Sequence, residues 1–390
     1  MLDFVARDAK AFFHQQGSSP CIGTLTASDG AWLIDDRGHR LLDLHGNTAH
    51  HIGYAHPRLI AALKLQLSTL VFSPRRYANA PATLLAENLT ARFRGGRSKL
   101  LLATGGSDAM EIAMRLARIA TGRTALVALE GAYHGHGFGA FALSTAHPDP
   151  RLGAGPPDIH HITPYWRDPD RMLAELEQVL RRGVAALVAE PMRSSCIVPP
   201  ADLWPQAADL CGRYGAKLIF DEIPSGLGKT GRFFAHEHFG VTPDMVVLGK
   251  ALGGGVLPIA AVLADDAMDI APELAIGHYT HEKNPVTARA ALTTLEIIDD
   301  EGLVARAARL GVYAAQRVAA TPVFTGLRGL GLLRALELPG PTAEALVPAA
   351  LARGVSTVAK DASSVGFSPP LTIDEAEIDL ALDRLATAAA

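Results

Sequence analysis

The chain has few cysteines, a small share of charged residues and no long apolar run, and each shortage excludes a class of protein. Its three cysteines, Cys21, Cys196 and Cys211, are widely spaced, which argues against a disulfide framework or a zinc site. Charged residues make up 19% of the chain and the formal net charge is −4. Because no extended basic run is present, nucleic acid or an anionic membrane is not expected as a partner.

Targeting and membrane-spanning patterns are missing as well. Residues 1–8 become acidic early and lack the apolar core of a secretory signal. Apolar stretches such as 256–264 fall far short of the length that crosses a bilayer. We therefore expect a cytoplasmic protein, most simply an enzyme, without a membrane partner.

What the chain does have is an alternation of short apolar runs and helical patterns from about 95 to 265. Such alternation is typical of an α/β fold with a mostly parallel sheet. The strand candidates are 99–103, 124–129, 185–189, 217–220, 245–248 and 259–263.

The two ends of the chain follow other patterns. Residues 1 to about 55 predict a helical arm and a hairpin with strands at 31–34 and 40–44. After residue 284 we expect one long helix from 285 to about 320, strands near 323–327 and 332–338, and a last helix from about 374. The predicted division is 1–55, an N-terminal arm with part of a small domain; 56–285, a large domain; and 286–390, an interdomain helix with the C-terminal small domain.

Lys250 and Asp221 stand at the ends of two of the predicted strands. The apolar run 245–248 leads to Lys250 and a glycine cluster, and the run 217–220 leads to Asp221. A lysine and an acid placed in this way are what pyridoxal phosphate (PLP) chemistry requires. The lysine forms a Schiff base with the cofactor aldehyde, and the acid keeps the ring nitrogen protonated so that the ring accepts electrons.

A glycine-rich turn, Thr104-Gly-Gly-Ser-Asp-Ala, leads from a predicted strand into a predicted helix. Gly106 and Ser107 would present backbone N–H groups and a hydroxyl at the helix N-terminus, where the helix dipole favours an anion. The alternative is an ordinary turn in which Ser107 and Asp108 cap the helix.

Two further strand ends carry candidate side chains. Tyr133, in the glycine-flanked run 131–137, could lie flat against a planar ring, or it could be a core or interface aromatic. Glu190 follows the run 185–189, at the sheet edge where open α/β folds bind ligands, or it caps the next turn.

Two other motifs could indicate different functions. The run 225–231 contains Gly-Lys-Thr like a nucleotide-binding P-loop, but Ile223 stands where that loop needs its first glycine. No helix pattern follows Thr230, so we reject a nucleotide hydrolase. Thr280 lies among donors that could join a phosphate site, whereas His281 fits a solvated loop, and the HExxH spacing of a zinc site is missing.

Taken together, the chain resembles the class III (ω-type) aminotransferases of the fold type I PLP enzymes over nearly its full length. The blocks that carry the resemblance are Thr104-Gly-Gly-Ser-Asp-Ala, Gly131-Ala-Tyr-His-Gly, Asp221-Glu-Ile-Pro-Ser-Gly-Leu-Gly-Lys-Thr-Gly with Pro243-Asp and Lys250, Thr280 through Asn284-Pro285, Arg328-Gly-Leu-Gly-Leu and Pro369-Pro-Leu.

The resemblance implies a large domain with a mostly parallel seven-stranded sheet that binds PLP, and a small α+β domain built from both chain ends. It also implies a homodimer with shared active sites, in which Thr280 reaches the phosphate from the partner subunit. Lys250 would carry the cofactor, with Asp221 on the ring nitrogen, Tyr133 on the ring and Glu190 near the substrate side. The other residues implied around the cofactor are Gly106, Ser107, His134 and Ile223.

Three departures from the family pattern bear on the substrate. Pro224 replaces a glutamine that contacts the cofactor's phenolic oxygen, and 281–283 is polar where the family has Phe-Gly-Gly. Gly366 replaces an arginine that clamps the α-carboxylate in many members that use amino acids. The missing arginine argues against a standard amino-acid/2-oxoglutarate enzyme.

The runs 43–57 and 74–77 resemble a subgroup that acts on phosphorylated or phosphonylated amines, in particular phospho-lyases and (R)-1-hydroxy-2-aminoethylphosphonate ammonia-lyases. Arg75, Arg76, Tyr77 and Asn47 are then candidate substrate residues. The alternative for Arg75 and Arg76 is pairing with surface acids.

The sequence therefore predicts a PLP-dependent class III aminotransferase-family enzyme that acts on the primary amine of a small anionic substrate, bearing a phosphonate or phosphate. The alternative is a PLP-dependent ammonia-lyase of a 1-hydroxy-2-aminoalkylphosphonate, or a phospho-lyase, on the same fold. An isomerase or racemase would share the apparatus. A PLP-binding regulator would need a DNA-binding extension, which the chain lacks.

Overall fold

A seven-stranded sheet forms the centre of the molecule in the computed structural model, which describes residues 3–146, 149–153 and 155–389. Its strand order is β4-β10-β9-β8-β7-β5-β6. The strands are β4 (Ser98–Ala103), β5 (Leu126–Leu129), β6 (Ile159–Ile162), β7 (Ala186–Ala189), β8 (Lys217–Asp221), β9 (Met245–Leu248) and β10 (Ala260–Asp265). Only β10 runs antiparallel to its neighbours. The predicted mostly parallel sheet is confirmed.

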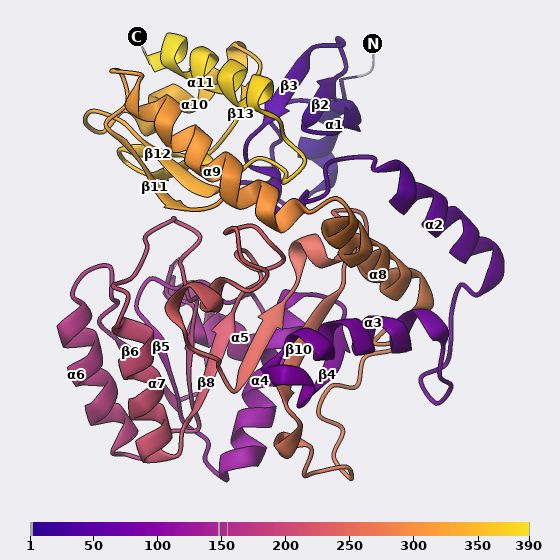
Figure 1. Ribbon diagram of the computed structural model, residues 1–390, viewed down its shortest axis with the longest axis vertical. Coiled ribbons are helices and arrows are strands. Elements are labelled where there is room, and N and C mark those ends of the chain that lie inside the picture. The colour runs from indigo at the N-terminus through magenta and orange to yellow at the C-terminus, as the bar shows by residue number, and fades with distance from the viewer. Residues whose placement is uncertain (1–2, 147–148, 154, 390) are drawn as a thin grey trace.

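Helices cover both faces of this sheet, which explains why its strands appear in the sequence as continuous apolar runs (Figure 1). All four residues of β5, β7 and β9 are buried. Helix α4 (Gly106–Thr121) packs on one face through alanine, isoleucine and methionine side chains. Helices α6 (Pro169–Leu180) and α7 (Leu203–Tyr214) pack on the other, where Trp204 meets Phe220.

Three helices flank the β4 and β10 side of the sheet. Helices α2 (Pro57–Thr69) and α3 (Ala80–Arg92) both pack against α8 (Pro285–Asp300). The short helix α5 (Phe138–Leu143) packs against α4 and β5. No helix among the described residues is long and apolar enough to cross a membrane.

The two chain ends meet in a smaller unit, which lies at the top of Figure 1. One of its sheets has the order β1-β2-β3-β13 and the other the order β11-β12-β15-β14. Strand β13 pairs in parallel with β3, so a C-terminal strand completes an N-terminal sheet. The strands are β1 (Leu25–Asp29), β2 (Trp32–Asp35), β3 (Arg40–Asp43), β11 (Gly326–Leu330), β12 (Leu333–Glu337), β13 (Val355–Ser356), β14 (Ala359–Asp361) and β15 (Ser364–Phe367), and the helices are α1 (Phe4–Ala11), α9 (Leu303–Ala319), α10 (Ala343–Ala352) and α11 (Glu375–Ala389).

Two element predictions were wrong in detail. The single helix expected from 285 to about 320 is two helices, α8 and α9, because Gly302 between them has a left-handed φ of 60°. The strand expected near 323–327 lies at Gly326–Leu330. The hairpin at 31–34 and 40–44 is confirmed as β2 and β3, and the domain boundaries after residues 55 and 285 stay predictions.

Candidate active site

Lys250 lies two residues after the end of strand β9 and opens a short 3-10 helix, Lys250–Gly253, with a left-handed φ of 44°. The residue is open to solvent. Enough protein nevertheless surrounds it that desolvation lowers the pKa of its amine, while the charges of Asp221 and Glu190 oppose this shift. The side chain is thus surrounded by protein on several sides but remains accessible to a ligand.

Asp221 ends strand β8 and is only 2% exposed. Its side chain points to the same face of the sheet as that of Ile219, which packs with α4, because successive residues of a strand alternate between the two faces. Oδ2 lies 2.8 Å from Nδ1 of His134, and Oδ1 accepts a hydrogen bond from the Ile223 amide at 3.1 Å. These two donors hold the carboxylate in one orientation and satisfy its charge.

The neighbouring acid, Glu222, faces the opposite way and has a structural role. Its carboxylate accepts hydrogen bonds from the amides of Ala235 at 2.6 Å and His236 at 2.9 Å, and Nδ1 of His236 lies 2.7 Å away. Of the Asp-Glu pair, only Asp221 is therefore directed toward Lys250.

Glu190 and Tyr133 complete the surroundings of Asp221. Glu190 is 6% exposed, and its Oε1 accepts a hydrogen bond from the Ser194 amide at 3.1 Å. Burial and then the charge of Asp221 raise the pKa of Glu190, and the same two causes raise the pKa of Tyr133. The fold thus brings Lys250, Asp221 and Glu190 within electrostatic reach of one another, with Tyr133 at their border.

The first turn of α4 forms a polar cradle beside this group. Gly105, the N-cap, provides no side-chain hydrogen bond, so the first N–H groups of the helix are free for a ligand. The Ser107 hydroxyl oxygen accepts a hydrogen bond from the His136 amide at 3.0 Å. A Cβ at Gly135 would lie 2.5 Å from that oxygen, which explains the glycine there.

Ile223 links the cradle to the lysine. A Cβ at Gly106 would lie 2.7 Å from Cδ1 of Ile223, and a Cβ at Gly249 would lie 3.4 Å from its Cγ1. An apolar side chain therefore spans the distance from the helix N-terminus to the residue before Lys250. The arrangement offers an anion cradle, a flat apolar floor, a buried carboxylate and a reactive amine.

The comparisons with known proteins agree on one family. A model described as aminotransferase class-III matches residues 13–389. The chain belongs to the class III aminotransferases. The cofactor of this family is PLP, which confirms the cofactor prediction.

Relatives within the family differ in their reactions. This class III enzyme is 32% identical over 419 residues to the (R)-1-hydroxy-2-aminoethylphosphonate ammonia-lyase of Vibrio splendidus, a match that covers 96% of this chain and 87% of the relative. It is 37% identical over 366 residues to the acetylornithine aminotransferase of Mycobacterium tuberculosis strain H37Rv, covering 91% and 88%. The ornithine aminotransferase structure from Toxoplasma gondii superposes with a TM-score of 0.88 at 28% identity, covering 99% and 94%.

The residues of this class III enzyme fit PLP. The free N–H groups of α4 and the Ser107 hydroxyl suit a phosphate. His134 fixes the orientation of Asp221, and the carboxylate retains lone pairs that can accept a hydrogen bond from a protonated ring nitrogen. The buried Nε2 of His134 has no hydrogen-bond partner among the described residues, so this histidine has no competing anchor.

His45 and Lys360, which the sequence analysis missed, lie within electrostatic range of Lys250, and Asn47 lies next to His45. Asn47 is exposed with a left-handed φ of 48° and lies within hydrogen-bonding reach of His45. Burial lowers the pKa of His45, and the charges of Lys360 and Lys250 lower it further. No local sequence pattern singles out His45 or Lys360, because chain segments far apart in sequence bring them to Lys250.

The remaining predicted substrate residues, and the predicted phosphate residue Thr280, lie elsewhere in this chain. Arg75, Arg76 and Tyr77 are exposed on the loop between α2 and α3, and Thr280 is exposed on a second loop. Within the described ranges, none of these four forms a hydrogen bond or ion pair with Lys250, Asp221 or Glu190.

The two loops that carry these residues contact each other. The Asn79 side-chain amide donates a hydrogen bond to the Lys283 carbonyl at 3.0 Å, and the Phe72 and His281 rings meet edge to face at 5.5 Å. The surface-acid alternative for Arg75 and Arg76 is not realised either, since neither forms an ion pair in the part of the chain that the structure describes.

The P-loop-like run around Lys229 is structural. Lys229 is fully buried, and its amine donates to the carbonyl of Ser368 at 3.1 Å and to that of Pro369. No α-helix starts directly after Thr230, because bends occupy 231–234 and only a short 3-10 helix, Ala235–Phe239, comes next. The rejection of a nucleotide-hydrolase function agrees with this geometry.

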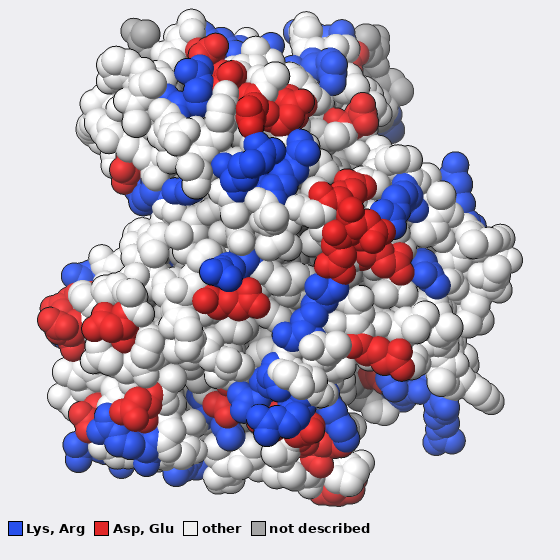
Figure 2. Space-filling model, in the orientation of Figure 1, with Lys and Arg blue, Asp and Glu red and all other residues white. Residues whose placement is uncertain are grey.

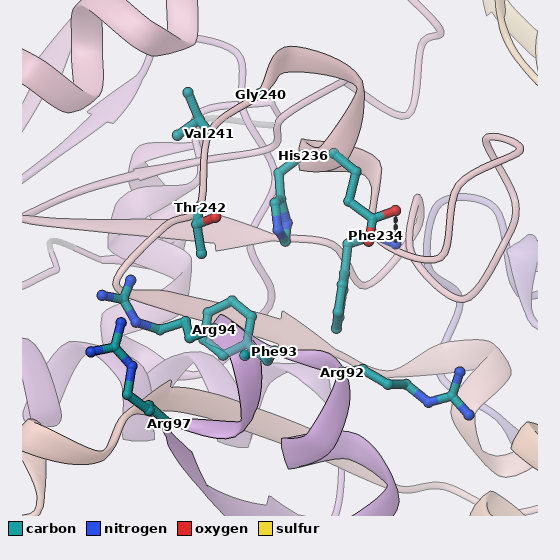
Figure 3. Close-up of a pocket in the computed structure, with 11 residues that line it drawn as sticks. Arg92, Phe93, Arg94, Arg97, Phe234, His236, Gly240, Val241 and Thr242 are labelled. Atoms are coloured by element: carbon teal, nitrogen blue, oxygen red, sulfur yellow. Dashed lines mark hydrogen bonds between the residues drawn. The ribbon is translucent and has the colours of Figure 1, made fainter.

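A separate surface pocket lies beside α3 and contains none of the predicted site residues (Figure 3). Arg92 and Arg94 line it, but Arg92 pairs with Asp299 and Arg94 with Asp265 at 2.6 Å. On the face drawn in Figure 2, charges of both signs are interspersed over the surface.

Proposed function

We propose that this class III enzyme removes ammonia from a small amine that bears a phosphonate and a hydroxyl on the neighbouring carbon. The observation that carries the proposal is Gly366 on β15, at a position where the resemblance to the family implies a carboxylate-clamping arginine. An α-amino acid or 2-oxoglutarate would lose a bidentate partner there. The ammonia-lyase relative, matched over 96% of the chain, supports the same substrate chemistry.

We assign the cofactor contacts residue by residue. Gly106 and Ser107 hold the phosphate, helped by Thr280 of the other subunit, and Asp221, oriented by His134, holds the ring nitrogen. Tyr133 and Ile223 would contact the ring, and Glu190 would lie on the substrate side. When bound, PLP supplies an aldehyde that joins to amines and a ring that withdraws electrons from the amine-bearing carbon.

Lys250 moves the protons. Once the substrate amine has displaced Lys250, the lysine amine would remove a proton from the amine-bearing carbon of the substrate. The lowered pKa of Lys250 favours its neutral form, which can act as a base. The resulting ammonium can return the proton to the leaving hydroxyl. The hydroxyl departs as water, and addition of water to the product releases ammonia and leaves a carbonyl, so atoms and electrons balance without an acceptor.

Transamination of a small anionic amine is the second candidate. The acetylornithine aminotransferase relatives favour it, because they share 37% identity over 91% of the chain. The same Lys250 would then return its proton to the cofactor rather than to the leaving hydroxyl. An amine substrate without a leaving group on the next carbon has only this outcome.

We also propose a homodimer whose active sites draw on both subunits. Thr280, Arg75 and Arg76 lie on mutually packed exposed loops rather than beside Lys250 of their own chain. A two-fold interface through these loops would bring them to the partner's site. Arg75, Arg76 and Tyr77 are then available to a substrate bound in the neighbouring subunit.

The test of the reaction is ammonia release without a keto acid. We would incubate the PLP-loaded enzyme with 1-hydroxy-2-aminoethylphosphonate and, in parallel, with 2-aminoethylphosphonate, which lacks the leaving hydroxyl. Many turnovers of ammonia from the first compound alone are expected. The Lys250→Ala variant is the control for non-enzymatic release.

One equivalent of product, followed by a halt with the cofactor in its amine form, would contradict elimination and support transamination. Full turnover that requires a keto acid would do the same. Equal ammonia release from both phosphonates would exclude a role for the hydroxyl as the leaving group.

A further inference from the structure

Lys360 lies in an irregular part of the small sheet, at its edge. Strand β14 pairs antiparallel with β15, but the register shifts between Ala359 and Asp361. Lys360 is the residue at this irregularity. A bulge bends the strand locally and re-aims the side chain that it carries.

The stem of Lys360 passes over Gly366. A Cβ at Gly366 would lie 3.1 Å from Cε of Lys360 and 3.7 Å from Oγ1 of Thr357. The Gly366 backbone is fixed on both sides, since its amide donates to the Val358 carbonyl at 2.8 Å and its carbonyl accepts from Thr357 Oγ1 at 2.6 Å. The space that a larger side chain at position 366 would need is therefore taken by a lysine.

The charge of Lys360 has no partner of its own. The residue is half-buried, and it forms no ion pair or hydrogen bond across the ranges that the structure describes. Its neighbour Asp361 is already paired with Arg328. A half-buried cation without a counter-ion is unfavourable, and an anionic ligand would relieve that cost.

The charge of Lys360 also affects the pKa values of Lys250 and His45. Lys360 is among the causes that lower the pKa of Lys250, behind burial, and it is the leading charge that lowers the pKa of His45. Backbone hydrogen bonds bring the His45 segment to this part of the small sheet, since the Leu44 amide donates to the Ser356 carbonyl at 2.9 Å and the Leu44 carbonyl accepts from the Ser368 amide at 2.8 Å. Lys360 therefore lies within electrostatic range of His45 and Lys250. An amine substrate that has displaced Lys250 would bind within range of the same charge.

We propose that Lys360, laid over Gly366, binds the anionic group of the substrate and sets the specificity of the site. This inference rests on the proposed function in one respect, namely that the substrate is an anionic amine. It differs from the expectation for Arg75 and Arg76, because the anion-binding cation belongs to the same chain as Lys250. A compact ammonium suits a tetrahedral phosphonate, whereas the fork of an arginine matches a planar carboxylate.

Binding can be measured apart from turnover. We would titrate the PLP-loaded enzyme with 2-aminoethylphosphonate, β-alanine and propylamine, following the change in cofactor absorbance to obtain Kd for each. The variants are Lys360→Met, which keeps the stem and removes the charge, and Lys360→Arg, which keeps the charge. Lys99→Met is the matched control, because Lys99 is an exposed lysine at the opposite end of β4 from the site, paired with Asp269.

Lys360→Met should weaken 2-aminoethylphosphonate binding by about 10- to 100-fold, the range for losing a hydrogen bond to a charged group. Propylamine binding should stay unchanged, and Lys360→Arg should recover most of the loss for the phosphonate. A larger loss of affinity for 2-aminoethylphosphonate than for β-alanine would assign the subsite to a tetrahedral anion. The reverse order would assign it to a carboxylate and overturn the phosphonate specificity.

Gly366→Ala provides an independent test, since its methyl group would displace the Lys360 stem without removing the charge. This variant should weaken the binding of the anionic amines and leave the binding of propylamine unchanged. Equal losses for charged and neutral amines in Lys360→Met, or no loss, would overturn the subsite. These results are independent of the proposed elimination, because a lyase could bind its anion elsewhere and a transaminase could bind its anion at Lys360.

Discussion

At the scale of single residues, the reactivity of Lys250 results from two opposed influences. Burial disfavours the ammonium and lowers its pKa, whereas the carboxylates of Asp221 and Glu190 favour the ammonium. Burial is the larger influence, so the pKa lies below that of an exposed lysine. A larger share of neutral amine is therefore present near neutral pH, as both cofactor attachment and proton abstraction require.

The first prediction concerns the pH dependence of cofactor attachment. The rate at which the apoenzyme combines with PLP should rise with pH and level off below about pH 10.4, the pKa of an unperturbed lysine. Asp221→Asn should move the midpoint to lower pH, because it removes the leading charge that stabilises the ammonium. Stopped-flow absorbance at a series of pH values measures both midpoints, and an upward shift in the variant would contradict this electrostatic account.

The residues of the site were predictable to different degrees. Lys250, Asp221 and Glu190 could be identified because each follows a buried apolar run, and the ends of such runs meet at one edge of a parallel sheet. Lys360 could not, since its place over Gly366 depends on a register shift between two short strands. His134 was found in a motif, but its contact with Asp221 emerges only from the fold.

At the scale of elements, the N-terminus of α4 depends on a close approach by the loop before α5. Gly135 has a φ of +124°, and the Ser107 side chain occupies the space where a Cβ would lie. The loop then places the His136 amide against the Ser107 hydroxyl. Backbone conformation and packing thus converge on the residue that we assign to the phosphate.

The second prediction compares two glycines that flank this helix. Gly135→Ala should weaken PLP binding, because the new methyl group would displace Ser107, and should also lower stability. Gly122→Ala, at the other end of α4, is at a left-handed φ of +65°, which strains an alanine less than the φ of Gly135, and has open space around its Cβ. It should lower stability by about 1 kcal/mol and leave PLP affinity intact.

Fluorescence titration with PLP and thermal unfolding of the apoenzyme separate the two effects. Equal losses of PLP affinity in both variants would mean that strain in α4, rather than displacement of Ser107, controls the cradle.

Elements were predictable where one local signal dominated. The central strands are continuous apolar runs because both faces of the sheet are covered. Strand β6, Ile159–Ile162, was missed because two histidines interrupt its apolar pattern and it pairs only with β5 at the sheet edge. The break between α8 and α9 had a signal in Gly302, but the helical periodicity on both sides outweighed it.

At the scale of the whole molecule, apolar side chains gather on α2 and the loop that follows it. Leu65, Leu67 and Val71 are 67%, 56% and 53% exposed. The same loop continues to Arg75 and Arg76 and contacts the segment next to Thr280. Apolar surface of this kind is typical of an interface between subunits, and here it adjoins residues that we assign to the substrate and the cofactor phosphate.

The third prediction tests whether sites are shared across that interface. Thr280→Asp should inactivate the enzyme, because it places a negative charge against the cofactor phosphate. After unfolding and refolding together, Thr280→Asp and Lys250→Ala subunits should regain activity that neither has alone, since a mixed dimer contains one intact site. Activity assays and light scattering measure the recovery and the size of the assembly.

Lys250→Ala mixed with Asp221→Asn is the matched control and should show no recovery, because both residues act within one subunit. Recovery in this control, or none with Thr280→Asp, would contradict the shared site. The whole-molecule arrangement was predictable only through the resemblance to the family, since no local pattern indicates that β3 and β13 share a sheet.

The central claim is that the amine of Lys250 holds the cofactor, and borohydride reduction followed by peptide mass spectrometry tests it most directly. The account predicts one pyridoxyl-modified peptide, which contains Lys250, and no such peptide in Lys250→Ala. Modification of Lys229 or Lys360 in the wild-type protein, with Lys250 unmodified, would contradict it.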